Sequence, residues 1–268
     1  MAPMIRRTHA LALAALSGSV LAVPVTAALA VDPVGTQEEA TKAAEASKSK
    51  VTGAVTFDGE LPEAKPLKVP EKAAAGCCPP GQSVDATDLS LVISEKGGIQ
   101  GVFVSAKVEG AKVDVPEKAV EMDQKGCRFL PHLLVVPVGT KVAFLNSDET
   151  SHNVHLITVL NEKLNQTVLA GSRLERTFEK AERIKVTCDM HTWMRAWVVV
   201  TDATHWAVTD ADGSFTIEGL PPGEHELKFW HETLGSKTAK VTVDESGKAE
   251  PVALKMAKKK SKKRRRRR

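Results

Sequence analysis

Four side chains in the second half of the chain have the types and spacing of a metal site. Cys188, His191 and Met194 follow one another at intervals of three residues, and His152 lies upstream. One thiolate, two imidazoles and one thioether are the ligands of a blue-copper site, a trigonal His2Cys plane with a weak axial Met. Structural zinc sites favour Cys or Cys/His ligands and have no thioether. The residues therefore predict a copper site; the alternative is that Cys188 and Met194 are ordinary core residues and both His lie at the surface.

The sequence around these residues predicts strands that would position them. Residues 185–187 run into Cys188 and residues 197–201 follow Met194, and both flanks are rich in β-branched or aromatic side chains. The three downstream residues are thus expected on a short loop between two strands. His152 is expected on a different loop, after a strand over residues 141–145.

Taken with its flanks, this stretch resembles the cupredoxins, the superfamily of plastocyanin, amicyanin and azurin. The C-x2-H-x2-M loop and the H-N-V-H run at residues 152–155 are most similar to amicyanin. Residues 129–146 match the pattern F-x-P-x-x-L-x-V-x-x-G-x-x-V-x-F-x-N that precedes the first ligand. The resemblance covers roughly residues 115–203 and implies a Greek-key β-sandwich.

The same resemblance implies a role for each site residue. His152, Cys188 and His191 would be the equatorial ligands of one type 1 copper, and Met194 the axial ligand. Asn153 would form a hydrogen bond near the thiolate and tether the two loops.

Three further cysteines and one histidine stand outside this ligand set. Cys127 and His132 occupy positions where plain cupredoxins do not usually carry Cys or His. In an exported protein, Cys127 is expected to form a disulfide with Cys77 or Cys78. The sequence leaves open a second metal site that uses Cys127 and His132, and also unpaired thiols.

A second β-domain is indicated at both ends of the chain. Residues 208–230 predict strand, Asp-Gly turn, strand, Pro-Pro-Gly turn, strand, and resemble the carboxypeptidase regulatory-like domain. Residues 51–69 predict two strands that look like the opening of the same module. We therefore expect an all-β protein in which the cupredoxin, residues 115–203, is inserted into a small sandwich formed by residues 51–114 and 204–257. The alternative is two sequential domains, with residues 51–114 in the cupredoxin half.

The N-terminus reads as a targeting segment. Arg6 and Arg7 precede an apolar run that ends in an A-x-A-like site at residues 28–30, which predicts a signal peptide over residues 1–30. A membrane span is the alternative. Residues 31–50 are polar and Ala-rich and predict a linker. Export to the periplasm or the cell surface follows.

Charge is segregated along the chain. The formal net charge is +4, yet residues 258–268 alone carry ten basic residues, so the body between signal and tail is acidic. Ten like charges cannot pack together, and the tail is expected to be disordered. On an exported protein, the partner expected for this basic tail is an anionic membrane, a surface polymer or an acidic redox partner and not nucleic acid. The alternative is a solvated tail with no dedicated partner.

These features predict an exported blue-copper protein that passes single electrons between redox partners and is not an enzyme. Multicopper oxidases need several H-x-H pairs, whereas the closest pair among the eight His here is His152 and His155. A copper chaperone or store, which usually has an open Met/His-rich site, is one alternative. A surface-binding β-protein with incidental copper is another.

Overall fold

The chain is described by a computed structural model that covers residues 49–74, 76–79 and 81–258. The predicted signal peptide, nearly all of the linker and the basic tail after Lys258 lie outside these residues. Among the described residues, no helix has the length and apolar character needed to cross a membrane.

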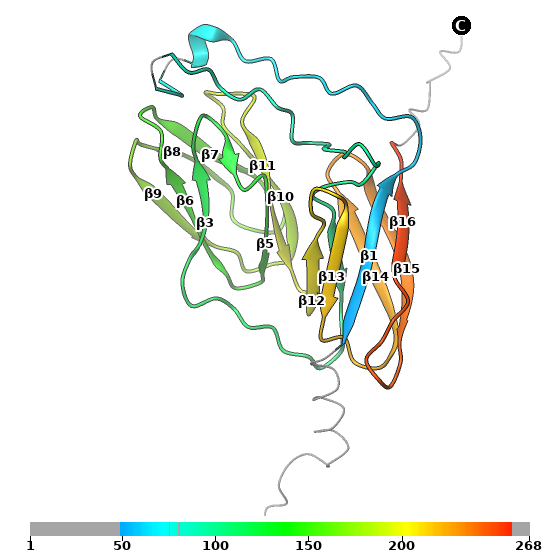
Figure 1. Cartoon of the computed structure of the whole chain (residues 1–268). Helices are drawn as coiled ribbons and strands as arrows, with labels where there is room; N and C mark the ends of the chain where they lie inside the picture. Colours follow the sequence, from blue (N-terminus) through cyan, green and yellow to red (C-terminus); the bar gives the residue numbers. More distant parts are fainter. Residues whose placement is uncertain (1–48, 75, 80, 259–268) are drawn as a thin grey trace, which may run out of the picture. The chain divides into compact units, whose positions relative to one another are not determined.

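The described residues form an all-β structure, which confirms the predicted fold class (Figure 1). The strands are β1 (Lys50–Phe57), β2 (Phe103–Ala106), β3 (Val120–Gln124), β4 (Phe129–Leu130), β5 (Leu133–Pro137), β6 (Lys141–Asn146), β7 (His152–Ile157), β8 (Leu164–Val168), β9 (Arg173–Thr177), β10 (Glu182–Thr187), β11 (Arg195–Thr201), β12 (His205–Val208), β13 (Ser214–Glu218), β14 (Gly223–His231), β15 (Gly235–Val243) and β16 (Val252–Met256). A single turn of 3-10 helix, η1, spans Glu71–Ala74.

Strands β3 to β11 form two sheets that enclose one apolar core. The first sheet has the order β5-β11-β10-β7-β8 and the second β4-β3-β6-β9. Side chains alternate between the two faces of a strand, so Val198 and Val200 of β11 enter this core while Val199 points to the opposite face and joins a separate small cluster. Burial on both faces explains why residues 196–200 of β11 are an unbroken run of apolar residues.

The remaining strands form a second pair of sheets with its own core, in the orders β13-β1-β16 and β12-β2-β14-β15. Strand β1 pairs antiparallel with β13 and parallel with β16, although these strands are far apart in the sequence (Figure 1). The turn before β13 approaches β1 closely at Gly213, where only a glycine fits because a Cβ would lie 2.4 Å from the carbonyl oxygen of Val55. This pairing supports the predicted discontinuous sandwich. The domain boundaries themselves stay a prediction.

The segment between β1 and β2 departs from the sequence prediction. Residues 58–70 contain no second strand. Pro62, Pro66 and Pro70 lack the backbone N–H that a central strand must donate. Much of this segment packs instead on the core of strands β3 to β11: Cys77 and Val84 belong to that core, and Leu67 and Val69 pack against it.

Candidate metal centre

The predicted ligands come from the ends of three strands of the first sheet. His152 is the first residue of β7, and residues 188–194 form the loop that joins the antiparallel pair β10 and β11. The loop is closed by two backbone bonds, Cys188 N–H to Met194 O at 3.3 Å and Met194 N–H to His191 O at 2.8 Å. A loop closed in this way holds its side chains in place without a metal ion.

Three of the four predicted ligands have their donor atoms together. The Nδ1 atoms of His152 and His191 are 2.9 Å apart, and Cys188 Sγ lies 3.7 Å from His191 Nδ1. All three donors lie within 4.8 Å of one another, and all three residues are buried. Met194 is also buried, at 1% exposure, in the same apolar cluster as Cys188. Two imidazoles and one thiol that face a common point fit a copper ion, which prefers nitrogen and sulfur donors.

Asn153 tethers the thiol to the neighbouring loop, as the resemblance implied. Its backbone N–H points to Cys188 Sγ at 3.5 Å, and its Oδ1 is 3.2 Å from the same sulfur. That Oδ1 also accepts the backbone N–H of Asp189 at 2.7 Å. Burial alone would raise the pKa of the Cys188 thiol, but hydrogen bonds from His152, Asn153 and nearby backbone groups outweigh it and lower the pKa. A thiol with a lowered pKa is prepared to bind metal as a thiolate.

Asp148 orients His152, a role that the sequence analysis did not predict. Its Oδ2 lies 2.8 Å from His152 Nε2, so the opposite ring atom, Nδ1, is directed at His191. Burial by itself would lower the pKa of His152, and the bond to Asp148 reverses the direction and raises it. The pKa of Asp148 is lowered: burial would raise it, but bonds from His152, Cys127 and Gly126 dominate. A carboxylate behind a ligand histidine fixes the tautomer and the ring orientation.

His191 is held between aromatic neighbours rather than by a carboxylate. Its ring makes edge-on contacts with His152 and with Trp193, at centroid distances of 4.7 and 5.2 Å. Burial, followed by the charge of His152, lowers the pKa of His191. Trp193 is itself buried and donates from Nε1 to the carbonyl oxygen of Cys127 at 3.1 Å. A neutral imidazole in this position is the form that binds metal.

A stretch of chain before β2 packs on the core that contains Cys188, Trp193 and Met194. This cover segment, residues 67–74, 76–79 and 81–88, packs apolar side chains on the core around the ligands. Asp85 forms an ion pair with Arg128. The carboxylate of Asp88 accepts hydrogen bonds from Arg195 Nη2, at 2.7 Å to Oδ1 and 2.8 Å to Oδ2. The cover segment was not predicted, because its contacts are with residues far along the chain.

A disulfide fixes the cover segment to the turn between β3 and β4. Of the two alternatives, Cys77 is the partner of Cys127, and Cys78 is a free cysteine. The turn holds Cys127 at a positive φ of 50°, with its N–H donated to Asp148 at 2.8 Å. The alternative second site of Cys127 with His132 does not form, because Cys127 is in the disulfide and His132 Nε2 pairs with Glu232.

His155, the second histidine of the H-N-V-H run, lies outside the donor group. Its Nδ1 pairs with Asp189 at 2.9 Å, and Asp189 also receives Asn165 Nδ2 at 2.7 Å. These side chains join β7 and β8 to the ligand loop from the solvent side. His155 lies three residues after His152 in the same strand, so the alternation of side chains places it on the opposite face from His152. This explains why His155 lies outside the donor group.

Comparison with known families agrees with this geometry. Residues 116–201 match the model for copper binding proteins of the plastocyanin/azurin family. Residues 194–257 match the model for the carboxypeptidase regulatory-like domain. No curated protein matches the chain. The protein therefore contains a plastocyanin/azurin-type copper-binding domain, a cupredoxin, together with a carboxypeptidase regulatory-like domain, and both recognised families are confirmed.

Three solved structures are similar to part of the chain. A copper-containing nitrite reductase from Thermus scotoductus is 28% identical over 36% of this chain, with a TM-score of 0.31; the match spans only 25% of the reductase. A purple cupredoxin from Nitrosopumilus maritimus is 26% identical, covers 31% of this chain and 99% of its own, and has a TM-score of 0.27. An oxidized amicyanin variant is 27% identical over 37% of this chain and 98% of its own, with a TM-score of 0.30.

Proposed function

We propose that this protein is an exported electron carrier with one type 1 copper. His152, Cys188 and His191 would hold the ion, with Met194 as the weak axial ligand. The observation that supports the proposal most is the convergence of three buried nitrogen and sulfur donors within 4.8 Å of one another. The match of residues 116–201 to a copper-binding family supports the choice of metal.

When bound, copper would supply a one-electron redox couple, and the chain's own residues would fix its surroundings. Asn153 holds the thiol and the ligand loop together, and Asp148 holds the His152 ring. Burial of all four predicted ligands excludes water from the donors. A rigid, dry site suits electron transfer, because its ligands are already held in place.

The competing proposal is a copper enzyme, since one similar structure is a copper-containing nitrite reductase. The chain spans a quarter of that protein, so the reductase's activity is not transferred to this chain. We propose that the copper here accepts and returns one electron without altering a substrate.

The test is an anaerobic redox titration of the copper-loaded, full-length protein. We expect one electron per copper with ascorbate as reductant, full recovery with ferricyanide, and no nitrite consumed by the reduced protein. The matched control is Cys188→Ser, which removes the thiolate and should lose reversible cycling. Catalytic loss of nitrite, or a copper ion that cannot be cycled, would contradict electron carriage.

We further propose that the basic residues 258–268 attach the exported carrier to an anionic surface. A polybasic segment contributes roughly 1 kcal/mol per basic residue near an anionic membrane, and exposed charges are screened beyond about 8 Å at physiological salt. Deletion of residues 258–268 should abolish salt-sensitive binding to phosphatidylserine-containing vesicles and leave the copper spectrum unchanged. Equal binding of both forms at low salt would reject the role of the tail.

A further inference from the structure

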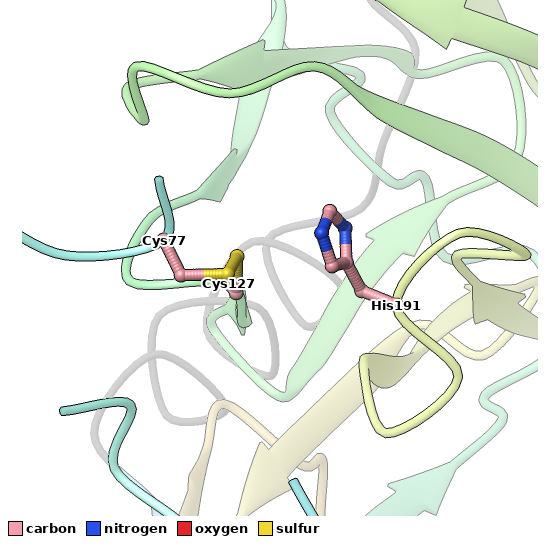
Figure 2. A group of neighbouring side chains, drawn as sticks. All are labelled: Cys77, Cys127 and His191. Atoms are coloured by element: carbon pink, nitrogen blue, oxygen red, sulfur yellow. A yellow bond between two sulfur atoms is a disulfide. The ribbon is translucent and has the colours of Figure 1, made fainter. Parts of the chain in front are cut away.

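Beside the predicted copper ligands lies a second group of buried donors, formed by Cys77, Cys127 and His191 (Figure 2). The exposed fractions are 2% for Cys77, 0% for Cys127 and 6% for His191. One donor atom from each residue, Sγ of the two cysteines and a ring nitrogen of His191, lies within 4.8 Å of the other two. Figure 2 shows the Cys77–Cys127 disulfide beside the His191 ring.

Cys127 is also close to the other ligand histidine. Its Sγ lies 3.9 Å from His152 Nε2, and its backbone N–H is held by Asp148 at 2.8 Å. The sulfur position is therefore fixed by the same carboxylate that orients His152. Cys127 Sγ therefore lies close enough to two imidazoles to share a metal ion with one of them.

The redox state of the two sulfurs decides whether they can bind a metal ion, because the thiolate is the ligand and a disulfide is not. We propose that reduction of the Cys77–Cys127 disulfide creates a second metal site, in which both thiolates and His191 hold a monovalent copper ion. Two thiolates and one imidazole are soft donors of the kind that select cuprous copper.

The chemistry balances with a dithiol as the reductant. The disulfide accepts two electrons and two protons, its S–S bond breaks, and two thiols form. The dithiol loses the same electrons and protons and closes its own S–S bond. Each thiol then releases its proton when it binds the metal.

His191 belongs to both donor groups, so the two sites are coupled. This coupling rests on the proposed type 1 site, whereas the second site itself does not. Cys77 lies in the cover segment, and reduction therefore replaces a covalent link between that segment and Cys127 by a metal link.

The test uses full-length Cys188→Ser, which lacks the thiolate of the type 1 site. Cuprous copper is titrated anaerobically against a chromophoric chelator, before and after treatment with dithiothreitol and its removal. Cys78 is the free thiol next to the disulfide, so Cys188→Ser/Cys78→Ser serves as the matched control for Cys188→Ser/Cys77→Ser. We expect reduction to add two free thiols and one tightly bound copper in Cys188→Ser and in the Cys78 control, and no added copper in the Cys77 variant.

X-ray absorption at the copper edge provides a measurement that does not depend on the folding of the Cys77 variant. The copper gained by reduced Cys188→Ser should have two sulfur neighbours and one nitrogen neighbour. The proposal is overturned if reduction adds no copper, if the folded protein's disulfide resists the dithiol, if the Cys77 variant gains copper equally, or if a single sulfur is found. None of these outcomes bears on the copper colour of the unmodified protein, so the failure of this site and that of the type 1 site are distinguishable.

Discussion

The carboxylate of Asp148 lies 2.8 Å from His152 Nε2 and accepts the backbone N–H of Cys127, also at 2.8 Å. It therefore joins the first predicted ligand to the turn that carries the disulfide. Asp148→Ala should weaken copper binding by about 10-fold to 100-fold, the usual cost of losing a group that orients a ligand histidine. It should also lower the free energy of unfolding by roughly 1–3 kcal/mol, because buried N–H groups lose their acceptor.

Chelator competition and denaturant unfolding measure the two effects. Glu149→Ala is the matched control, since Glu149 is an exposed carboxylate next in the chain. Equal copper affinity in Asp148→Ala and Glu149→Ala would contradict an orienting role.

Met194 is predicted to tune the copper and not to create the site. A weak axial bond can be lost while a trigonal plane survives, so Met194→Leu should retain copper and raise the reduction potential. Met190→Leu is the control, because Met190 lies in the same loop and is 47% exposed. Protein-film voltammetry measures the potential, and a Met194→Leu protein that binds no copper would show the axial assignment to be wrong.

Glu182 is predicted to make stability depend on pH. Burial would raise its pKa, but bonds from Asn161 and the backbone N–H groups of Val159 and Leu160 lower it. A carboxyl whose folded-state pKa is below its unfolded value stabilises the fold above that unfolded value, and the contribution is lost as pH falls through the folded pKa.

Glu182→Gln should therefore reduce the free energy of unfolding by about 1 kcal/mol at pH 7. The difference from the unmodified protein should shrink to near zero in acid. Glu179→Gln, an exposed neighbour, should show no such trend in parallel urea titrations. A deficit in Glu182→Gln that is constant from pH 7 to pH 3 would refute the assignment.

Strands β1 and β2 are predicted to form one discontinuous sandwich with residues 204–257, whereas the cover segment between them packs on the core of strands β3 to β11. Val55 is fully buried and its strand pairs with β13 and β16. Val55→Ala should cost roughly 1–2 kcal/mol and speed hydrogen exchange in β13 and β16 more than in β5 and β7. Exchange that accelerates first in β5 and β7 would favour sequential domains.

Three of the four candidate ligands could be proposed from the sequence because they lie close together in the chain. Cys188, His191 and Met194 lie on one tight loop, whose geometry depends on residues within that loop and its flanking strands. Asp148 could not be assigned in advance, since its role follows from a turn between β3 and β4 that the fold brings to it. The signal that could have drawn attention to it is its position four residues before His152.

The cover segment shows a different limit of sequence reasoning. The apolar residues that lead into it, over residues 58–70, alternate as in a strand, but the prolines there remove the donors that a strand needs. The choice between Cys77 and Cys78 likewise depends on how the segment lies on the core, which adjacent identical residues cannot reveal.

The visible spectrum of the copper-loaded protein tests the central claim most directly. A thiolate bound to cupric copper should give an intense charge-transfer band, which Cys188→Ser should abolish and which Cys78→Ser should leave in place. Full copper occupancy in the unmodified protein without that band would contradict a type 1 site at His152, Cys188 and His191.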